Sequence, residues 1–528
     1  MRSTFGGFYV AKSGLDASRS NIEVTGNNIT NANSIGYTRQ RVDLNAIGSY
    51  SGTMRYSTNS ALYIGEGVQM KGISQIRDPF LDVRYRKESA KLGETGAVGD
   101  VLKDLGYLFD DAVNTSFDTQ FSDFVKQLQS LAESPSDPVT ENIVKTSATT
   151  LLQLFHQCAN ELQAVKKQTM TEVTDGALRN ANLALDSIAK LNQAIKSANI
   201  SGNPALELVD QRNKLIDELS QYLNIDVTTK QVDVGSGVIV DEVSINFVAK
   251  NGDKFNLVNN DKYRQFELSE TGGKLGLVLT ESDGTPVDTS DLGSISLTNG
   301  EITGQLRDGV FSGYLSMLNS KGEFDTPPNT TRGIGYYEEM LDSVVNKFAT
   351  LMNEANGVNG NDKPLFETSD GSTKITAANI AISKQWESAT GNYITNSKKP
   401  ISPGVDNSDD SSNILYMISL FKEDHSFISG EGTPNEIKVF TGTFQESIAN
   451  MSTTLGLQIK GNDRIQKTNI SNIKDVDYQR QSVSGVSLDE EGINLIMYNQ
   501  SLTAASRFLT TLDEALETIV TRMGVVGR

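Results

Sequence analysis

The sequence predicts an α+β protein of several domains, in which long helices at the two ends of the chain pair as a coiled coil. Both ends carry apolar residues at a seven-residue spacing, which is typical of a coiled-coil seam. Between them, the apolar residues of 80–224 follow the helical period, and from 225 the period changes to the alternation of strands. A chain of 528 residues is also too long for a single core.

These patterns divide the chain into four expected parts. A terminal coiled-coil assembly domain is expected at 1–44 plus 483–528, and an irregular connector with possible short strands at 45–79. A mainly helical domain with irregular loops is expected at 80–224 plus 301–482, and an inserted small antiparallel β domain at 225–300.

The N-terminal segment predicts one helix with a weak seam. One heptad position holds the larger residues Phe8, Leu15, Ile22 and Ile29. The other holds the small residues Ala11, Ser18, Thr25 and Ala32. Because small residues bury little apolar area, we expect this helix to be only marginally stable in water on its own. The same small residues would allow another helix to approach closely.

An Asn-rich stretch, NNITNANSIGYTRQRVDL, follows this seam. Asn33 and Gly36 tolerate the left-handed conformation of a helix C-cap, so we expect the helix to end there. Tyr37, Arg39 and Arg41 are then candidate contacts to the second domain or to a neighbouring subunit.

Turn residues mark the elements of the middle of the chain. Pro135, Pro138 and the segment 201–204 interrupt the helical stretch. Asn251-Gly252 and Gly272-Gly273 separate alternating runs, which predicts β-hairpins. Residues 357–412 are loop-rich, and further helices are expected at 304–319, 336–356, 411–421 and 442–457.

The C-terminal segment carries the strongest pattern in the chain, and one helix over 486–526 would be about 60 Å long. Its two seam positions are Leu488, Leu495, Leu502, Leu509, Leu516 and Met523, and Tyr498, Ala505, Leu512, Ile519 and Val526. Such a seam would promote aggregation if it faced water, so it needs a partner: the other terminus, neighbouring subunits or a chaperone.

The charges of the two ends favour their pairing. Residues 1–41 carry five cations and two carboxylates, a net charge of +3, whereas residues 483–528 carry three cations and six carboxylates, a net charge of −3. We therefore expect Phe8, Leu15, Ile22 and Ile29 to pack against Leu495, Leu502, Leu509, Leu512, Leu516 and Ile519.

The composition argues against several functions. A net charge of −19 is unsuited to binding nucleic acid, which needs a basic face. The chain has two histidines and one cysteine, so a catalytic triad or His-rich metal site lacks its residues. Cys158 follows His156 by two positions, but helical spacing turns them apart and places Cys158 among core residues. The acidic loops 356–366 and 405–413 lack calcium-loop spacing and are expected to be solvated turns.

Targeting signals are also missing from the sequence. The N-terminus has no apolar core of a secretory signal, and no run of about 18 apolar residues predicts a membrane helix. Ordinary rules place the chain in the cytosol, although a non-classical export route would leave no trace in this pattern. No cofactor, metal or enzymatic activity is expected.

The two ends resemble the bacterial flagellar axial proteins, the family of rod, hook and hook-associated proteins. The resemblance lies in NNITNANSIGYTRQ near the start and in VSGVSLDEEGINLIMYNQSLTAASRFLTTLDEALETIV near the end. The form Gly36-Tyr37-Thr38-Arg39-Gln40 and the segments at 207–227 and 304–318 are similar to the hook-associated proteins of the hook–filament junction.

This resemblance implies a structural role without catalysis. It implies export by the flagellar type III system without signal cleavage, and assembly as a ring at the distal end of the hook. The implied partners are further copies of the chain, the hook protein, hook-associated protein 3 and an export chaperone that binds the C-terminal region. Two alternatives stay open: another rod- or hook-type axial protein, or an axial protein whose β insert is a surface ligand-binding or adhesive module.

Overall fold

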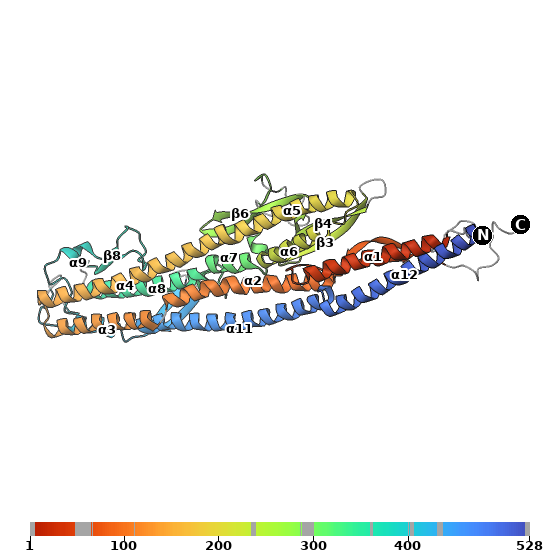
Figure 1. Cartoon of the computed structure of the whole chain (residues 1–528). Helices are drawn as coiled ribbons and strands as arrows, with labels where there is room; N and C mark the ends of the chain where they lie inside the picture. Colours follow the sequence, from red (N-terminus) through yellow and green to blue (C-terminus); the bar gives the residue numbers. More distant parts are fainter. Residues whose placement is uncertain are drawn as a thin grey trace, which may run out of the picture.

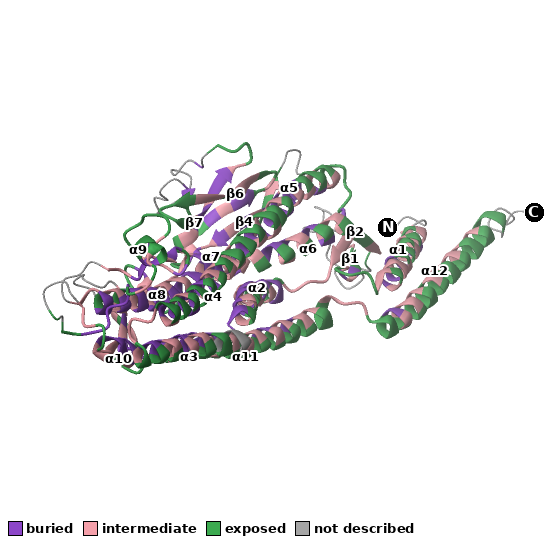
Figure 2. Ribbon diagram, turned by 90° about the vertical axis from the view of Figure 1, so that its left-hand side faces the viewer, coloured by how far each residue is buried: buried purple, intermediate pink, exposed green. Residues whose placement is uncertain are grey.

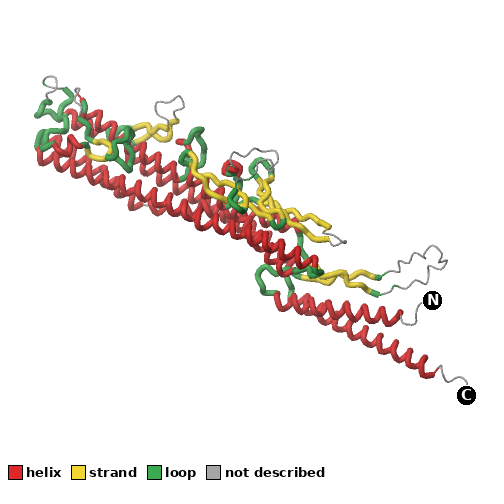
Figure 3. Tube along the Cα trace, turned by 90° about the horizontal axis from the view of Figure 1, so that it is seen from above, coloured by secondary structure: helices red, strands yellow, loops and turns green. Residues whose placement is uncertain are grey.

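The computed structural model describes residues 6–47, 65, 67–109, 111–233, 239–285, 287, 300–358, 363–399, 401, 406–429 and 437–522. These residues form a long helical body from which one pair of helices extends at one end (Figures 1 and 3). The described termini of the chain both lie at the far end of that pair.

Twelve α-helices are described: α1 (Gly6–Asn31), α2 (Pro79–Leu108), α3 (Asp111–Glu133), α4 (Pro138–Thr171), α5 (Arg179–Ile200), α6 (Leu206–Tyr222), α7 (Val310–Asn319), α8 (Ile334–Asn356), α9 (Lys384–Ser388), α10 (Ser412–Ser419), α11 (Phe444–Ser484) and α12 (Leu488–Arg522). A π-helical segment, η3 (Glu172–Leu178), joins α4 to α5, and short 3₁₀ turns lie at η6 (Thr303–Gln305) and η7 (Gly322–Phe324).

The helix boundaries follow from capping residues. Both α2 and α4 begin with an Asp-Pro pair, in which the Asp side chain accepts hydrogen bonds from the first free amides and Pro occupies the first turn. Thr443 and Glu446 form a reciprocal capping box at the start of α11. The expected breaks at Pro135, Pro138 and 201–204 are confirmed, because α3 ends at Glu133 and α5 at Ile200.

Strands β3 to β7 form one antiparallel sheet in sequence order, as the alternating pattern predicts. The strands are β3 (Ile225–Asp233), β4 (Ile239–Val248), β5 (Lys254–Asn259), β6 (Lys262–Thr271) and β7 (Lys274–Glu281). Gly252 and Gly272 have φ values of +93° and +61°, the left-handed region that both predicted turns require. The sheet lies along α5 and α7 (Figure 2), and its inner residues share one core with these helices. Whether it binds a ligand stays a prediction.

Three two-stranded ribbons complete the fold. They are β1 (Gln40–Ala46) with β2 (Val68–Gln75), β8 (Phe366–Thr368) with β9 (Ile380–Ile382), and β10 (His425–Ser429) with β11 (Ile437–Gly442). Residues 61–73 were expected to supply a short strand, and β2 covers the part from 68 onward; residues 61–64 lie outside the described part of the chain. The strand at 40–46 was not expected, because residues up to 44 were assigned to the coiled coil.

The main core lies in the body and is rich in aromatic rings. Phe348 contacts rings from α3, α4, β8, α11 and the turn after α10, since its side chain lies at the centre of the cluster Phe121, Phe124, Phe155, Phe366, Phe421 and Phe444. The continuous core extends from Val101 to Leu455 and contains no residue of α1 or α12. The terminal helices therefore do not contribute to the packing that stabilises the body.

A second helix pair, α2 with α11, runs along the body (Figure 1). Only the first part of α11 was expected to be helical, yet the helix is 41 residues long. Its contact with α2 is largely polar: Asn462 Nδ2 donates to the carbonyl oxygen of Thr95 at 2.9 Å, and Asn469 Nδ2 donates to that of Lys91 at 3.3 Å. A polar contact face leaves no apolar periodicity in the sequence, which explains why this length was not predicted.

Candidate assembly interface

From Leu495 to Leu516 the seam of α12 has the register that the heptad pattern predicts, whereas Leu488, its first expected member, is 54% exposed. The half-buried apolar residues of this helix include Leu495, Tyr498, Leu502, Ala505, Leu509, Leu512 and Leu516. The other side chains between Asn499 and Thr521 are exposed, and no apolar residue of α12 is fully buried. One partner helix thus covers one stripe of α12 and leaves the rest of the helix accessible.

The covered stripe of α1 differs in detail from the expected one. Ala11, Ser18 and Thr25, at the small seam position, are buried together with Ala17 and Val24. The larger seam residues Phe8, Leu15, Ile22 and Ile29 are half-buried at the flank. The fully buried positions of the α1 seam are thus held by small residues, which allow close approach of the partner helix.

Helices α1 and α12 run antiparallel. Asn28 near the end of α1 reaches Glu491 at the start of α12, and a Cβ on Gly7 would lie 3.1 Å from Leu512. Leu516 and Ile519 therefore lie beyond Gly6, where the described part of α1 begins, and the side chain of Ile519 is 44% exposed. The seam residues Met523 and Val526 fall outside the described residues.

The hairpin β1–β2 packs on α1 and makes the terminal pair a three-part unit. The amide of Val68 donates to Ser13 Oγ at 3.2 Å. Gly67, with φ of +105°, lies so close to α1 that a Cβ there would come within 2.3 Å of Ser13 Oγ. The part of 45–79 that the structure describes is thus a second layer over the N-terminal helix.

Asn28 connects the three parts. Its side chain is 1% exposed, receives the amide of Gln40 at 3.0 Å and the Tyr37 hydroxyl at 2.9 Å, and donates to the Gln40 carbonyl at 2.9 Å. It also lies 3.4 Å from a carboxylate oxygen of Glu491. The Asn-rich stretch therefore supplies a buried amide that joins α1, β1 and α12.

The end of α1 agrees closely with the expectation. The helix ends at Asn31, two residues before Asn33, and Gly36 has a φ of +86° in the left-handed region. Tyr37 and Arg39 then turn back toward the terminal pair. Arg41 pairs with Asp43 of its own strand at 3.1 Å and donates to Ser74 Oγ of β2 at 3.4 Å, so it is held within the hairpin and is exposed there.

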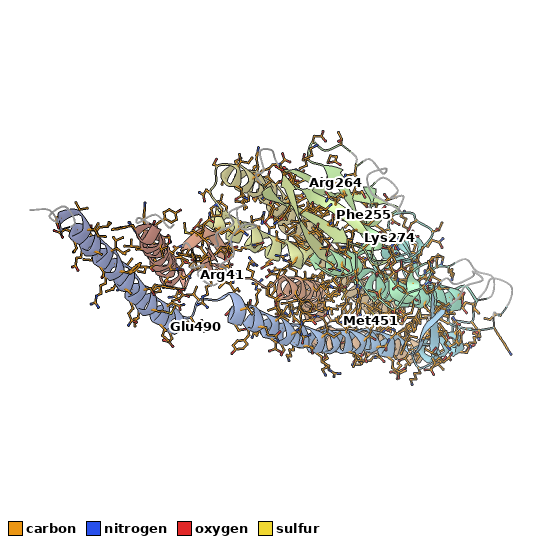
Figure 4. All side chains as sticks on the ribbon, turned by 90° about the vertical axis from the view of Figure 1, so that its right-hand side faces the viewer. Arg41, Phe255, Arg264, Lys274, Met451 and Glu490 are labelled. Carbon is orange, nitrogen blue, oxygen red and sulfur yellow. The ribbon has the colours of Figure 1, made fainter. Side chains whose placement is uncertain are left out.

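Arg39 and Thr38 form a joint between the terminal pair and the body. Arg39 binds Glu490 at 2.8 Å and Glu491 at 2.7 Å, and its amide donates to Ser484 at the end of α11. Thr38 donates through its amide and its hydroxyl to Asp210 of α6, at 3.1 and 2.6 Å. Two consecutive residues thus hold α12, α11 and α6 together (Figure 4 shows Glu490 and Arg41 here).

The titratable groups of the joint influence one another's pKa values. Burial raises the pKa of Tyr37 to about 12, and the carboxylates of Asp210, Glu207 and Glu491 add to this shift. Burial also raises the pKa of Asp210, against the effect of its hydrogen bonds from Thr38. The residues around the joint line a polar groove of about 720 Å³. Sequence reasoning missed Asn28, Thr38 and Asp210 because single polar residues carry no periodic signal.

The described residues offer no arrangement for catalysis. His156 Nε2 lies 2.8 Å from the carbonyl oxygen of Ile380, and His425 Nε2 lies 2.6 Å from that of Leu420. Cys158 is buried, and its burial raises its pKa to about 12, which disfavours a thiolate nucleophile. Within the described ranges, no three His, Cys, Asp or Glu side chains gather as a metal site would need. None of the described helices is both long and apolar enough to cross a bilayer.

Known proteins with the same architecture identify the family. The model of the flagellar hook-associated protein FlgK helical domain matches residues 102–364, and that of the flagella basal body rod protein matches residues 8–38. The flagellar hook junction protein FlgK from Burkholderia pseudomallei has a similar fold, with a TM-score of 0.56 and 12% identity, over 76% of this chain and 100% of that one.

Full-length relatives agree with this match. Flagellar hook-associated protein 1 of Bacillus subtilis (strain 168) is 27% identical over 545 residues, with 100% of both chains covered. The protein of the same name from Salmonella typhimurium is 23% identical, covering 97% of this chain and 98% of that one. The chain therefore belongs to the flagellar hook-associated protein 1 family, and it is a structural component of the hook–filament junction rather than an enzyme.

Proposed function

We propose that the α1–α12 pair is the part of the chain through which it is built into the flagellum. In this proposal the copies form a ring at the distal end of the hook, between the hook protein and hook-associated protein 3. Phe8, Leu15, Ile22, Ile29, Tyr37, Arg39, Leu495, Leu502, Leu509, Leu512, Leu516 and Ile519 form the assembly interface.

The observation that carries this proposal is the position of α12 outside the main core. Its apolar seam is covered on one side only, and large apolar residues remain exposed elsewhere on the helix. Ile493 is 67% exposed, Ile496 61% and Phe508 46%. Exposed apolar residues on a helix that the body does not need are typical of a surface covered by neighbouring subunits.

The same helix fits the proposed export route. A flagellar type III system would pass the chain in an unfolded state, and a chaperone bound to the C-terminal region would cover α12 in the cytosol. A unit with few buried apolar residues costs little free energy to unfold. Its folding would be completed by contacts with neighbours in the flagellum.

The test is the double variant Leu509→Asp with Leu516→Asp. We expect the body to keep its thermal transition, because neither residue belongs to its core, while cells that carry the variant bear hooks without filaments in electron micrographs. The matched control, Asn499→Asp with Ser506→Asp, places two charges at the same seven-residue spacing on an exposed polar side of α12, turned away from Phe508. Normal filaments with the seam variant would refute the proposal.

A further inference from the structure

A groove on the body carries carboxylates without enough cations to balance them. It has a volume of about 350 Å³, lies between α2 and the junction of α4 with η3, and is lined by Asp100, Asp104, Glu172, Lys103, Tyr107 and Tyr314. Lys103 reaches Asp100 at 3.9 Å, and both side chains are more than half exposed. Tyr107 is 79% exposed at the rim.

The carboxylates of this groove repel one another. Burial raises the pKa of Asp104, and Glu172 and Asp100 raise it further; Asp100 is raised by burial and by Glu172 in the same way. The neutral contacts of the groove include hydrogen bonds from Gln168, at 3.1 Å to Asp104 and 3.3 Å to Glu172, and a hydrogen bond between Tyr314 and Glu172. An incoming cation would relieve this repulsion.

The outer face of α11 has the opposite character. Lys460, Arg464 and Lys467 are exposed on one side of the helix, and none of the three forms an ion pair with a described residue. Leu457, 67% exposed, and Gly461 lie among them. This face combines cations with an apolar ridge, which complements a groove that combines carboxylates with an exposed tyrosine ring.

The two surfaces point to different sides of the body. Gly99 and Gly106 mark the side of α2 that meets α11, where Asn462 and Ile459 lie against them. At 100° per residue, Asp104 lies about 150° from the midpoint of that contact on α2, and Arg464 lies about 170° from its midpoint on α11. One chain therefore cannot close the contact on itself, whereas adjacent copies can repeat it head to tail.

We infer that the basic face of α11, formed by Leu457, Lys460, Gly461, Arg464 and Lys467, docks into the groove at Asp100, Asp104 and Glu172 of a second copy of this chain. The inference rests on the proposed ring, and it assigns the contact between neighbouring bodies to charge complementarity. The terminal pair would then set the position of the chain in the axis, and this contact would set the lateral register of the copies.

Cross-linking tests this contact directly. The variant Asp104→Cys with Arg464→Cys places one thiol in each surface, and the native Cys158 is buried. Treatment of purified flagella with a short bis-maleimide should give dimers and higher multimers of this chain, whereas each single-cysteine variant should give none. A cross-link to a different flagellar protein, or an unchanged monomer band, would overturn the inference.

Charge reversal gives an independent test in cells that lack the native protein. Asp100→Lys with Asp104→Lys, and Lys460→Glu with Arg464→Glu, should each reduce the number of filamented cells about tenfold or more, because like charges would meet. The combination of all four changes should restore the number to within about twofold of wild type. Failure of the combination to restore filaments, or no loss in the two parent variants, would refute the contact.

A control separates a general effect of charge from this contact. Lys250→Glu with Lys262→Glu changes the net charge as Lys460→Glu with Arg464→Glu does, but at an exposed turn after β4 and at the exposed first residue of β6. It should leave filaments unchanged. Labelled wild-type protein absent from the hook tip would refute the proposed function, whereas wild-type protein at the tip with normal assembly of the reversed variants would refute this inference alone.

Discussion

Asn28 shows how much one buried amide contributes to the terminal unit. Asn27 and Asn31 pair with each other along α1, with Asn31 Nδ2 at 2.8 Å from Asn27 Oδ1, but Asn28 faces inward and serves both backbone groups of Gln40. Without Asn28, the amide and carbonyl of Gln40, the first residue of β1, would lose these two hydrogen bonds. A side chain with both a donor and an acceptor is needed here, which explains an amide rather than an acid.

Replacement of Asn28 by Ala should loosen the terminal unit. It leaves the amide and carbonyl of Gln40 buried without these partners, which costs about 1–3 kcal/mol. Hydrogen exchange should show faster exchange of the amides in α1 and β1, while α8 keeps its protection. The exposed Asn33 supplies the control, and equal exchange in Asn28→Ala and Asn33→Ala would contradict this role.

Glu141 is a second polar residue with a defined task. Its side chain belongs to the first turn of α4, is 3% exposed, and accepts hydrogen bonds from Trp386 Nε1 at 3.3 Å and from the amide of Tyr393 at 3.0 Å. It holds the loop segment after α9 against the start of α4. The positive end of the helix dipole favours a carboxylate at this position.

The single tryptophan reports on this contact. Glu141→Ala should lower the stability of the body by about 2–4 kcal/mol, because three amide and indole donors lose a charged acceptor. We expect the emission of Trp386 to shift to longer wavelength at a lower denaturant concentration than in wild type. Glu387→Ala, which removes an exposed carboxylate next to the tryptophan, should leave the transition unchanged.

At the scale of elements, helix contacts depend on glycine where backbones approach most closely. Gly313 of α7 lies against α2, where a Cβ would come within 2.7 Å of the Glu94 carbonyl oxygen and 2.8 Å of Ala97 Cβ. We expect Gly313→Ala to destabilise the body by about 1–3 kcal/mol, since the helices must separate. Gly176→Ala, with open space around its Cβ, should be neutral or stabilising in the same thermal melts.

The same contact between α2 and α7 depends on pH. Burial raises the pKa of Glu94 from 4.5 to about 7, with a further contribution from Asp308. A carboxyl with a raised pKa binds its proton more tightly in the folded chain, so its contribution to stability is present below pH 4.5 and is lost as the pH rises through 7.

Glu94→Gln should therefore become more stable than wild type as the pH rises. The full shift corresponds to about 3 kcal/mol, and solvent screening of this partly accessible group reduces the expected gain to about 1–2 kcal/mol at pH 8. Thermal melts of both proteins from pH 4 to pH 8 measure the difference. A difference in melting temperature that stays constant with pH would contradict the assignment.

Periodicity decided which elements could be predicted from the sequence. The seam of α12 repeats Leu at seven-residue intervals, and the structure places Leu495, Leu502 and Leu509 on the covered stripe. The hairpins at Gly252 and Gly272 followed in the same way from alternation and turn residues. The second half of α11 meets α2 through Asn462 and Asn469, and the one fully buried apolar residue there, Val476, leaves no apolar repeat.

The candidate interface was predictable to a similar degree. The pairing of the two termini followed from matching seams and opposite charges. Its detailed packing did not, because the fully buried positions are Ala11, Ser18 and Thr25, which look unimportant in the sequence beside Phe8 and Leu15. The joint at Thr38 depends on Asp210, 172 residues away, and such a contact has no signature in one sequence.

At the scale of the whole molecule, the joint decides how the terminal pair is set against the body. Between α11 and α12 the chain passes through Gly485, Val486 and Ser487, and no apolar core residue spans this point. Arg39 holds the start of α12 from the other side, and the carboxylate of Glu491 is 2% exposed. The buried ion pair beside this short linker therefore fixes the angle between the terminal pair and the body, because no apolar packing fixes it here.

Reversal of Arg39 should release that angle without unfolding the body. Arg39→Glu would place a third carboxylate beside Glu490 and Glu491, and breaking such a buried pair costs about 3–5 kcal/mol. This loss is confined to the joint, because the core of the body does not include these residues. Small-angle X-ray scattering should show a broader distribution of interatomic distances, while the main thermal transition stays within about 2 °C of wild type.

A charge-exchange variant and a control variant at Arg41 complete this experiment. Arg39→Glu combined with Glu490→Arg restores one opposite-charge pair across the joint and should recover much of the wild-type scattering profile. Arg41→Glu makes the same charge change two residues away, where the side chain is 64% exposed, and should leave the profile unchanged. If Arg39→Glu scatters as Arg41→Glu does, the angle is held by the α1–α12 contact itself, and the arginine is not its determinant.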